Sequence, residues 1–168
     1  MQSDVTTRDI DALLRATGRA DQPAAFYAVL RRILQEKPGF VFATLFVVHE
    51  GETLRVFTTE EALYPAGMRK PMGATDWGEQ VIRQRRSFLA TDVAGLRRAF
   101  FDHETIVGLG CGSAIGVPVV YDGRCLGSIN LNHQEHVYTP AHVEMVERVA
   151  PTVVPAFLQA IHGLQRNG

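Results

Sequence analysis

Cysteine is scarce in this 168-residue chain, and neither a long hydrophobic run nor a surplus of one charge is present. The two cysteines, Cys111 and Cys125, exclude a disulfide-dense scaffold and cannot form a structural zinc site alone. Lysine and arginine number 17 against 18 aspartates and glutamates, so the basic surplus typical of nucleic-acid binding is missing. No stretch reaches the roughly 18 apolar residues of a membrane span. We therefore expect a cytoplasmic protein with free thiols and with no nucleic-acid or membrane partner.

The remaining composition is that of an ordinary globular domain. Hydrophobic residues make up 46% and charged residues 21% of a chain long enough to bury a core. The N-terminus lacks the basic and apolar regions of a signal peptide. No repeat, low-complexity tract or linker divides the sequence. We expect a single domain over residues 21–165, preceded by a helical or flexible extension over residues 1–20.

The hydrophobic pattern alternates between helical and strand periods and predicts an α+β fold. An amphipathic helix ends near residue 37, and a β-hairpin follows over residues 40–58. Residues 59–74 contain two prolines and two glycines and are typical of a long loop, often a lid over a binding site. The later elements are a helix over 75–86, a strand over 87–90, a helix over 92–103, a glycine-rich connection over 107–112, a hairpin over 113–132 with an Asp-Gly turn, and a helix from 139 that Pro151 and Pro155 should kink.

Three segments of the chain resemble the GAF domain family. SAIGVPVVYDGRCLGSINLN (113–132) resembles the strand–turn–strand core of GAF domains, and DWGEQVIRQRRSFLATDV (76–93) resembles their middle helix and short strand. YTPAHVEMVERVA (138–150) resembles the helix that follows. Their order and spacing extend the resemblance over about residues 20–165. It implies a GAF/PAS-like central antiparallel sheet, with N- and C-terminal helices on one face and a ligand pocket under loops and short helices on the other.

The resemblance also implies a sensory or regulatory role. GAF domains bind small ligands between one sheet face and its covering loops, often dimerise through their terminal helices, and usually lie beside an output domain. From the length of 168 residues we expect no output domain in addition to the GAF-like domain. We therefore expect a small organic ligand, a homodimer formed through the terminal helices, and a separate output protein such as a kinase or a transcription regulator.

A row of polar residues on one strand is the main site candidate. Ser128, Asn130 and Asn132 share one face of the strand over 125–132, while Ile129 and Leu131 occupy the other. Periodicity alone is equally consistent with a solvated sheet face. The GAF resemblance favours a pocket, because this face lies beneath the covering loops. Neutral amides both donate and accept hydrogen bonds, which suits an uncharged or zwitterionic ligand.

Four further residues are candidates for the lining of this pocket. Trp77 is the only tryptophan and follows the long loop, so it is either a core anchor or an aromatic pocket wall, and Tyr64 has the same two interpretations. His103 either lies on the surface at a helix end or hydrogen-bonds a ligand. Cys111 lies between glycines, where it is either buried and inert or close to the cavity.

An enzyme of the same fold is the main alternative to a binding domain. Free-methionine sulfoxide reductase is a stand-alone GAF enzyme that uses cysteine thiols and substrate-binding carboxylates. Ala114, Asn130 and Asn132 stand where that family has carboxylates, and its two cysteines fall near Trp77 and Val107. These departures favour a binding domain without catalytic residues, although thiol chemistry at Cys111 stays open. A pure interaction module, with its cavity filled by side chains, is a third class.

Other ligand classes lack their sequence signatures. The Asn-Lys-x-Phe-Asp-Glu pattern of cyclic-nucleotide GAF domains does not occur, and neither cysteine is followed by the histidine of bilin-binding domains. His133, His136 and His142 match no standard metal-ligand spacing. We expect no metal and no cofactor.

Overall fold

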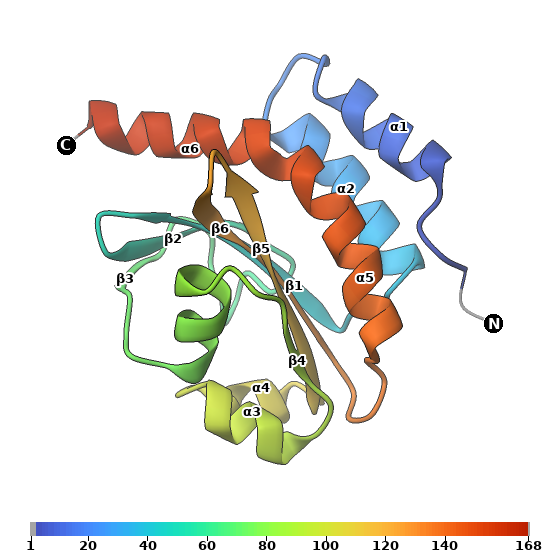
Figure 1. Ribbon diagram of the computed structural model, residues 1–168, viewed down its shortest axis with the longest axis vertical. Helices are drawn as coiled ribbons and strands as arrows, with labels where there is room; N and C mark the ends of the chain where they lie inside the picture. The colour runs from blue at the N-terminus through green and yellow to red at the C-terminus, as the bar shows by residue number, and fades with distance from the viewer. Residues whose placement is uncertain (1–2, 168) are drawn as a thin grey trace.

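The computed structural model describes residues 3–167, which fold as an α+β domain around a six-stranded antiparallel sheet (Figure 1). The elements in chain order are α1 (Thr7–Ala16), α2 (Ala24–Glu36), β1 (Phe42–His49), β2 (Glu52–Thr58), β3 (Arg69–Pro71), the π-helical segment η1 (Gly78–Arg83), β4 (Phe88–Ala90), α3 (Val93–Ala99), α4 (His103–Gly108), β5 (Ser113–Tyr121), β6 (Arg124–His133), α5 (Pro140–Val149), the 3₁₀ segment η2 (Ala150–Val153) and α6 (Val154–Arg166). No helix within residues 3–167 has both the length and the apolar character needed to cross a membrane.

The sheet is built from two hairpins placed side by side. Its strand order is β3-β2-β1-β6-β5-β4, so the first strand of one hairpin pairs with the second strand of the other. The pairing of β1 with β6 runs in register from Phe42 opposite Asn132 to Val47 opposite Gly127. The two strands at the centre of the sheet therefore come from segments far apart in the sequence.

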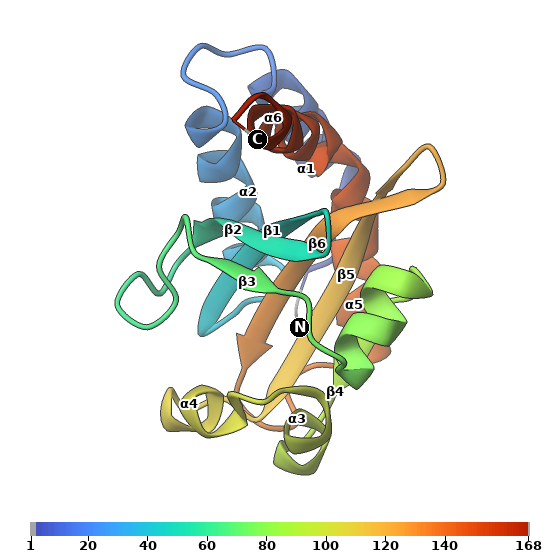
Figure 2. The same ribbon diagram turned by 90° about the vertical axis from the view of Figure 1, so that its left-hand side faces the viewer.

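The α-helices at the two ends of the chain cover one face of this sheet (Figures 1 and 2). Because successive side chains point to opposite faces of a strand, alternate residues of the central strands enter the core beneath these helices. The largest core side chains lie on both layers and include Leu45, Ile115, Ile129, Leu131, Phe26, Leu30, Ile33 and Phe157, all at most 1% exposed. Leu13 and Ala16 of α1 are buried in the same core. Each fully buried aliphatic side chain contributes about 1.5–3 kcal/mol to stability.

The opposite face carries a thinner cover made of η1, β3, α3, α4 and the segment between β2 and β3 (Figures 1 and 2). Two small clusters, one around Tyr64 and Leu96 and one around Trp77 and Val81, hold this cover against the sheet. The cover has few fully buried side chains, so it leaves space over the central strands.

The structure confirms the predicted α+β fold and adds two elements to the sequence prediction. Strand β3 lies within the segment expected to be loop, and helix α4 begins at His103, where a helix was expected to end. The C-terminal helix is interrupted by η2, as Pro151 predicts, because proline lacks the amide hydrogen that a continuous helix requires. The proposed boundary at residue 20 stays a prediction.

Candidate functional site

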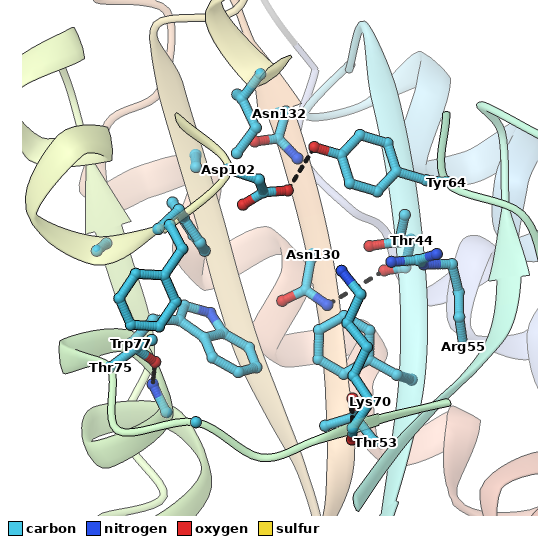
Figure 3. Close-up of a pocket in the computed structure, with 18 of the residues that line it drawn as sticks. Thr44, Thr53, Arg55, Tyr64, Lys70, Thr75, Trp77, Asp102, Asn130 and Asn132 are labelled. Carbon is cyan, nitrogen blue, oxygen red and sulfur yellow. Dashed lines mark hydrogen bonds between the residues drawn. The ribbon is translucent and has the colours of Figure 1, made fainter. Parts of the chain in front are cut away.

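A cavity of about 240 Å³ lies between the central strands and the thinner cover (Figure 3). Its floor is formed by β1, β5 and β6, and its walls by β2, β3, η1 and the turn between α3 and α4. The polar lining residues are Thr44, Thr53, Arg55, Tyr64, Lys70, Thr75, Trp77, Asp102, Asn130 and Asn132. This volume is just below the roughly 300–1,000 Å³ of pockets for drug-sized ligands, so it suits a small metabolite. An interaction module with a filled core would have no such space.

Trp77 forms one wall of the cavity and also anchors its cover. The side chain is 7% exposed and packs edge-on against Phe46, with ring centroids 5.4 Å apart. Phe100 lies on another side, at 6.4 Å. The indole rests directly over Gly116 of β5, where any side chain would collide with it. The two interpretations of Trp77 from the sequence, core anchor and pocket wall, therefore describe the same position.

Tyr64 forms the opposite wall, on the segment that joins β2 to β3 (Figure 3). Its ring stacks on Phe42 at 5.1 Å, and its hydroxyl donates to Oδ2 of Asp102 at 2.5 Å. Burial, and then the hydrogen bond to Asp102, raise the pKa of Tyr64, so the phenol stays protonated. This bond ties the segment before β3 to the turn between α3 and α4 across the cavity.

Arg55 lies beside Tyr64 and was not among the residues predicted from the sequence. Its guanidinium carbon lies 5.1 Å from the centroid of the Tyr64 ring, and its Nη1 donates to the carbonyl of Pro65 at 3.1 Å. The residue is only 8% exposed. Burial lowers the pKa of the guanidinium from its usual value, and the nearby Asp102 carboxylate acts in the opposite direction. Arginine remains charged in proteins, so a cation is buried at this wall.

A bulge in β2 turns Arg55 toward the cavity. Leu45 pairs with Phe57, but Phe46 pairs with Arg55, so Val56 has no partner on β1. Strict alternation from Phe57, whose partner Leu45 faces the helices, would place Arg55 on that same helical face. The extra residue reverses the alternation and puts Arg55 beside Phe46, over the cavity. Bulges of this kind are frequent next to functional sites, where they redirect a side chain.

The predicted polar row of β6 forms the floor of the cavity only in part. Asn130 and Asn132 line it, whereas Ser128 is fully buried behind Asn130. The Asn130 amide donates to the Ser128 hydroxyl at 3.0 Å and to the carbonyl of Thr44 at 3.4 Å. Oδ1 of Asn132 has no hydrogen-bond partner among the described residues. Asn130 is therefore held in place by the protein, while Asn132 has an unused acceptor.

Three residues proposed from the sequence do not line the cavity: His103, Cys111 and Ser128. His103 is half-buried at the first position of α4, a helix that the sequence pattern did not predict. The thiol of Cys111 is 3% exposed and packs in the cluster around Tyr64. Tyr64, Trp77, Asn130 and Asn132 are brought together around the cavity, and Arg55, Lys70 and Asp102 join them from segments without a recognised motif.

Cys111 is expected to be chemically inert in the folded protein. Burial raises the pKa of its thiol to about 11, so at pH 8 about one thiol in a thousand is ionised. We predict that Ellman's reagent at pH 8 leaves Cys111 unmodified in native protein and modifies it fully in urea, as read by peptide mass spectrometry. Rapid native labelling at Cys111, matching that of the urea-treated sample, would restore the thiol-enzyme hypothesis.

The sheet, the helices on one face and the covered cavity on the other together define a GAF-type architecture. A family model described as GAF domain matches residues 20–157, which is most of the chain. The protein therefore belongs to the GAF domain family, as the resemblance in the sequence implied. A search of curated proteins found no significant match.

Solved structures with the same fold come from proteins of several kinds. The GAF domain of a phosphoenolpyruvate-protein phosphotransferase from Coxiella burnetii is 17% identical with a TM-score of 0.70, covering 93% of this chain and 96% of that one. The GAF domain of a two-component sensor histidine kinase from Bacillus halodurans is 9% identical with a TM-score of 0.59, over 72% and 83%. The fRMsr of Staphylococcus aureus, solved in complex with its substrate, is 14% identical with a TM-score of 0.68, over 94% and 98%. At these identities the similarity concerns the fold alone.

Proposed function

We propose that this GAF domain is a sensory or regulatory module that binds a small polar organic molecule in the cavity over β1, β5 and β6. The observation that supports the proposal is the placement of unpartnered polar atoms. Nε of Arg55 and Oδ1 of Asn132 are buried without a hydrogen-bond partner among the described residues, and both residues line the cavity. A buried unsatisfied polar group costs about 1–3 kcal/mol, and a ligand that hydrogen-bonds to it recovers that cost.

The cover of the cavity is suited to respond to an occupant. The segment between β2 and β3 is tied to the turn between α3 and α4 by the bond from Tyr64 to Asp102, and to β2 by the bond from Arg55 to Pro65. A ligand that contacts both walls therefore favours the closed arrangement of this segment. In this proposal the change reaches α5 and α6 through the sheet, and these helices form a homodimer that acts on a separate cytoplasmic output protein, such as a kinase or transcription regulator.

Native mass spectrometry of the purified protein tests both the ligand and the dimer. We expect a species of twice the chain mass that carries one small organic molecule per chain. Release of that molecule in organic solvent then gives its mass. A bare monomer would contradict the homodimer, and a protein without any retained or added small-molecule ligand would contradict the binding function.

A double variant tests the position of the site. Replacing Asn130 and Asn132 with alanine removes the amides from the cavity floor, and we expect the affinity for the released molecule to fall at least tenfold. The measurement is isothermal titration calorimetry with the re-added molecule. His103→Ala, outside the cavity, is the control and should bind normally. Unchanged affinity in the double variant would show that the ligand lies elsewhere.

A further inference from the structure

The side chains that line the cavity carry a net positive charge. Arg55, Lys70 and Asp102 are the only lining residues with ionisable acidic or basic groups apart from Tyr64, so one positive charge is in excess. Among residues 3–167, no ion pair includes Arg55 or Lys70. By contrast Arg69, the neighbour of Lys70 on β3, pairs with Glu52 at 3.0 Å on the outer surface.

Arg55 keeps most of its donors free. Nη1 donates to Pro65 and contacts the sulfur of Met68 at 3.8 Å, whereas neither Nε nor Nη2 makes a hydrogen bond within the described part of the chain. A buried charge is costly unless it is paired, and the carboxylates of Asp102 and Glu61 act on this guanidinium only from beyond ion-pair distance. Its two free nitrogens form a planar fork, which matches the two oxygens of a carboxylate.

Asp102 does not supply that carboxylate. Its Oδ2 accepts a hydrogen bond from the hydroxyl group of Tyr64. No oxygen of Asp102 lies within 4.0 Å of the Arg55 guanidinium. The same bond reduces its capacity to hold a ligand ammonium group. The remaining lining is neutral: Asn132 and Asn130 at the floor, and aromatic side chains at the walls (Figure 3). The cavity thus has a cationic region at Arg55 and Lys70. The rest of its lining is uncharged, with amides at the floor and aromatic side chains at the walls.

We propose, on the basis of the binding function above, that the ligand is a small organic monocarboxylate with an uncharged, partly apolar body. Its carboxylate accepts hydrogen bonds from Nε and Nη2 of Arg55, and Lys70 adds a second positive charge from the β3 side (Figure 3). The body lies between Trp77 and Phe42, and a polar group on it bonds to the Asn132 amide, which can present either its oxygen or its nitrogen. This assignment replaces the uncharged or zwitterionic ligand expected from the amides alone.

The single tryptophan provides a reporter for the test, because Trp77 lines the cavity. The ¹⁵N-labelled protein is titrated with benzoate, nicotinate and butyrate and with their primary amides, and the Trp77 indole signal is followed by NMR. We expect at least one acid to shift this signal with an affinity at least tenfold above that of its amide. Arg55→Met should lower the affinity for that acid about tenfold to a hundredfold, as expected for losing a charge-assisted bond.

Two further variants distinguish a loss of carboxylate binding from a folding defect or a general charge effect. Arg55→Lys keeps the charge without the planar fork, so it should still prefer the acid over the amide while binding it more weakly than the unaltered protein. Arg69→Met removes a charge of the same sign from the adjacent strand outside the cavity, and should bind the acid normally. Equal loss in Arg69→Met and Arg55→Met would show a general charge effect and overturn the inference.

The outcomes separate this inference from the binding function itself. If amides shift the Trp77 signal as strongly as acids, or if Arg55→Met binds the acids unchanged, the carboxylate assignment fails while small-molecule binding stands. If native mass spectrometry finds a bound molecule without a carboxylate, the assignment fails in the same way. If no compound shifts the signal and no molecule is retained, both proposals fail.

Discussion

Gly127→Ala is expected to destabilise the fold by about 3 kcal/mol or more, the largest effect of any substitution considered for this chain. Gly127 lies in the centre of the sheet, between Val47 of β1 and Val119 of β5. A Cβ atom at this position would lie 2.0 Å from the carbonyl oxygen of Phe46 and 2.8 Å from the Cα of Val47. Both neighbours are backbone atoms, so β1 must move away from β6, and the cavity floor moves with it.

Urea denaturation of Gly127→Ala and the unaltered protein measures this loss. Gly163→Ala is the matched control, because Gly163 lies in α6 and, apart from the adjacent backbone of that helix, nothing lies within 4 Å of the position that an added methyl group would take. Alanine is the better helix former by about 0.5–1 kcal/mol, so the control should be as stable as the unaltered protein or slightly more so. A Gly127→Ala protein that unfolds at the same urea concentration as the control would contradict the close approach of β1 and β6.

The order of most elements and two residues of the cavity floor were predictable from the sequence because their signals are local. The apolar strand around Leu45, the Asp-Gly turn and the alternation of Ile129 and Leu131 with Asn130 and Asn132 each lie within a few residues. The pairing of β1 with β6 was not among the predictions and comes from the structure. Two amides, Asn130 and Asn132, were expected on the face opposite the helices, and both line the cavity there.

Arg55 was not predictable in the same way, because its direction depends on a bulge. The segment Leu54–Phe57 contains a single polar side chain among apolar ones, which is typical of a strand at the edge of a core. Only the pairing with β1 shows that Val56 is the extra residue and that Arg55 points toward the cavity. Register across strands is a tertiary property, and a one-residue shift exchanges the two faces.

Strand β3 and the short helix α4 escaped prediction for a related reason. The three residues Arg69–Pro71 are exposed, carry two cations and end in proline, a composition that protects edge strands but does not signal a strand. Without α4, only a glycine-rich connection was expected before Cys111, and His103 and Cys111 were both candidates for the cavity lining. The helix instead keeps His103 out of the cavity lining and leaves the buried thiol within the cover.

Gly116→Ala is expected to close the cavity while leaving the protein folded. A Cβ atom on Gly116 would lie 2.5 Å from Nε1 of Trp77 and 3.5 Å from Oδ1 of Asn130. Unlike the neighbours of Gly127, these are side-chain atoms, so the indole can move. It must shift by about 1 Å to reach ordinary contact, and Phe46 and Phe100 occupy two of its sides. We therefore expect the indole to move toward the cavity that it lines.

The expected results are a loss of about 1–3 kcal/mol in stability and at least a hundredfold loss of affinity for the acid that shifts the Trp77 signal. Fluorescence of Trp77 measures the displacement, and titration of the indole NMR signal measures the affinity. Gly108→Ala is the matched control on the cover, since no atom lies within 4 Å of the added methyl position. Unchanged Trp77 emission and unchanged acid binding in Gly116→Ala would show that the indole does not rest on β5. Loss of binding together with a retained fold would instead identify the space into which the indole moves, beside Trp77 and over the central strands, as the site where the ligand is held.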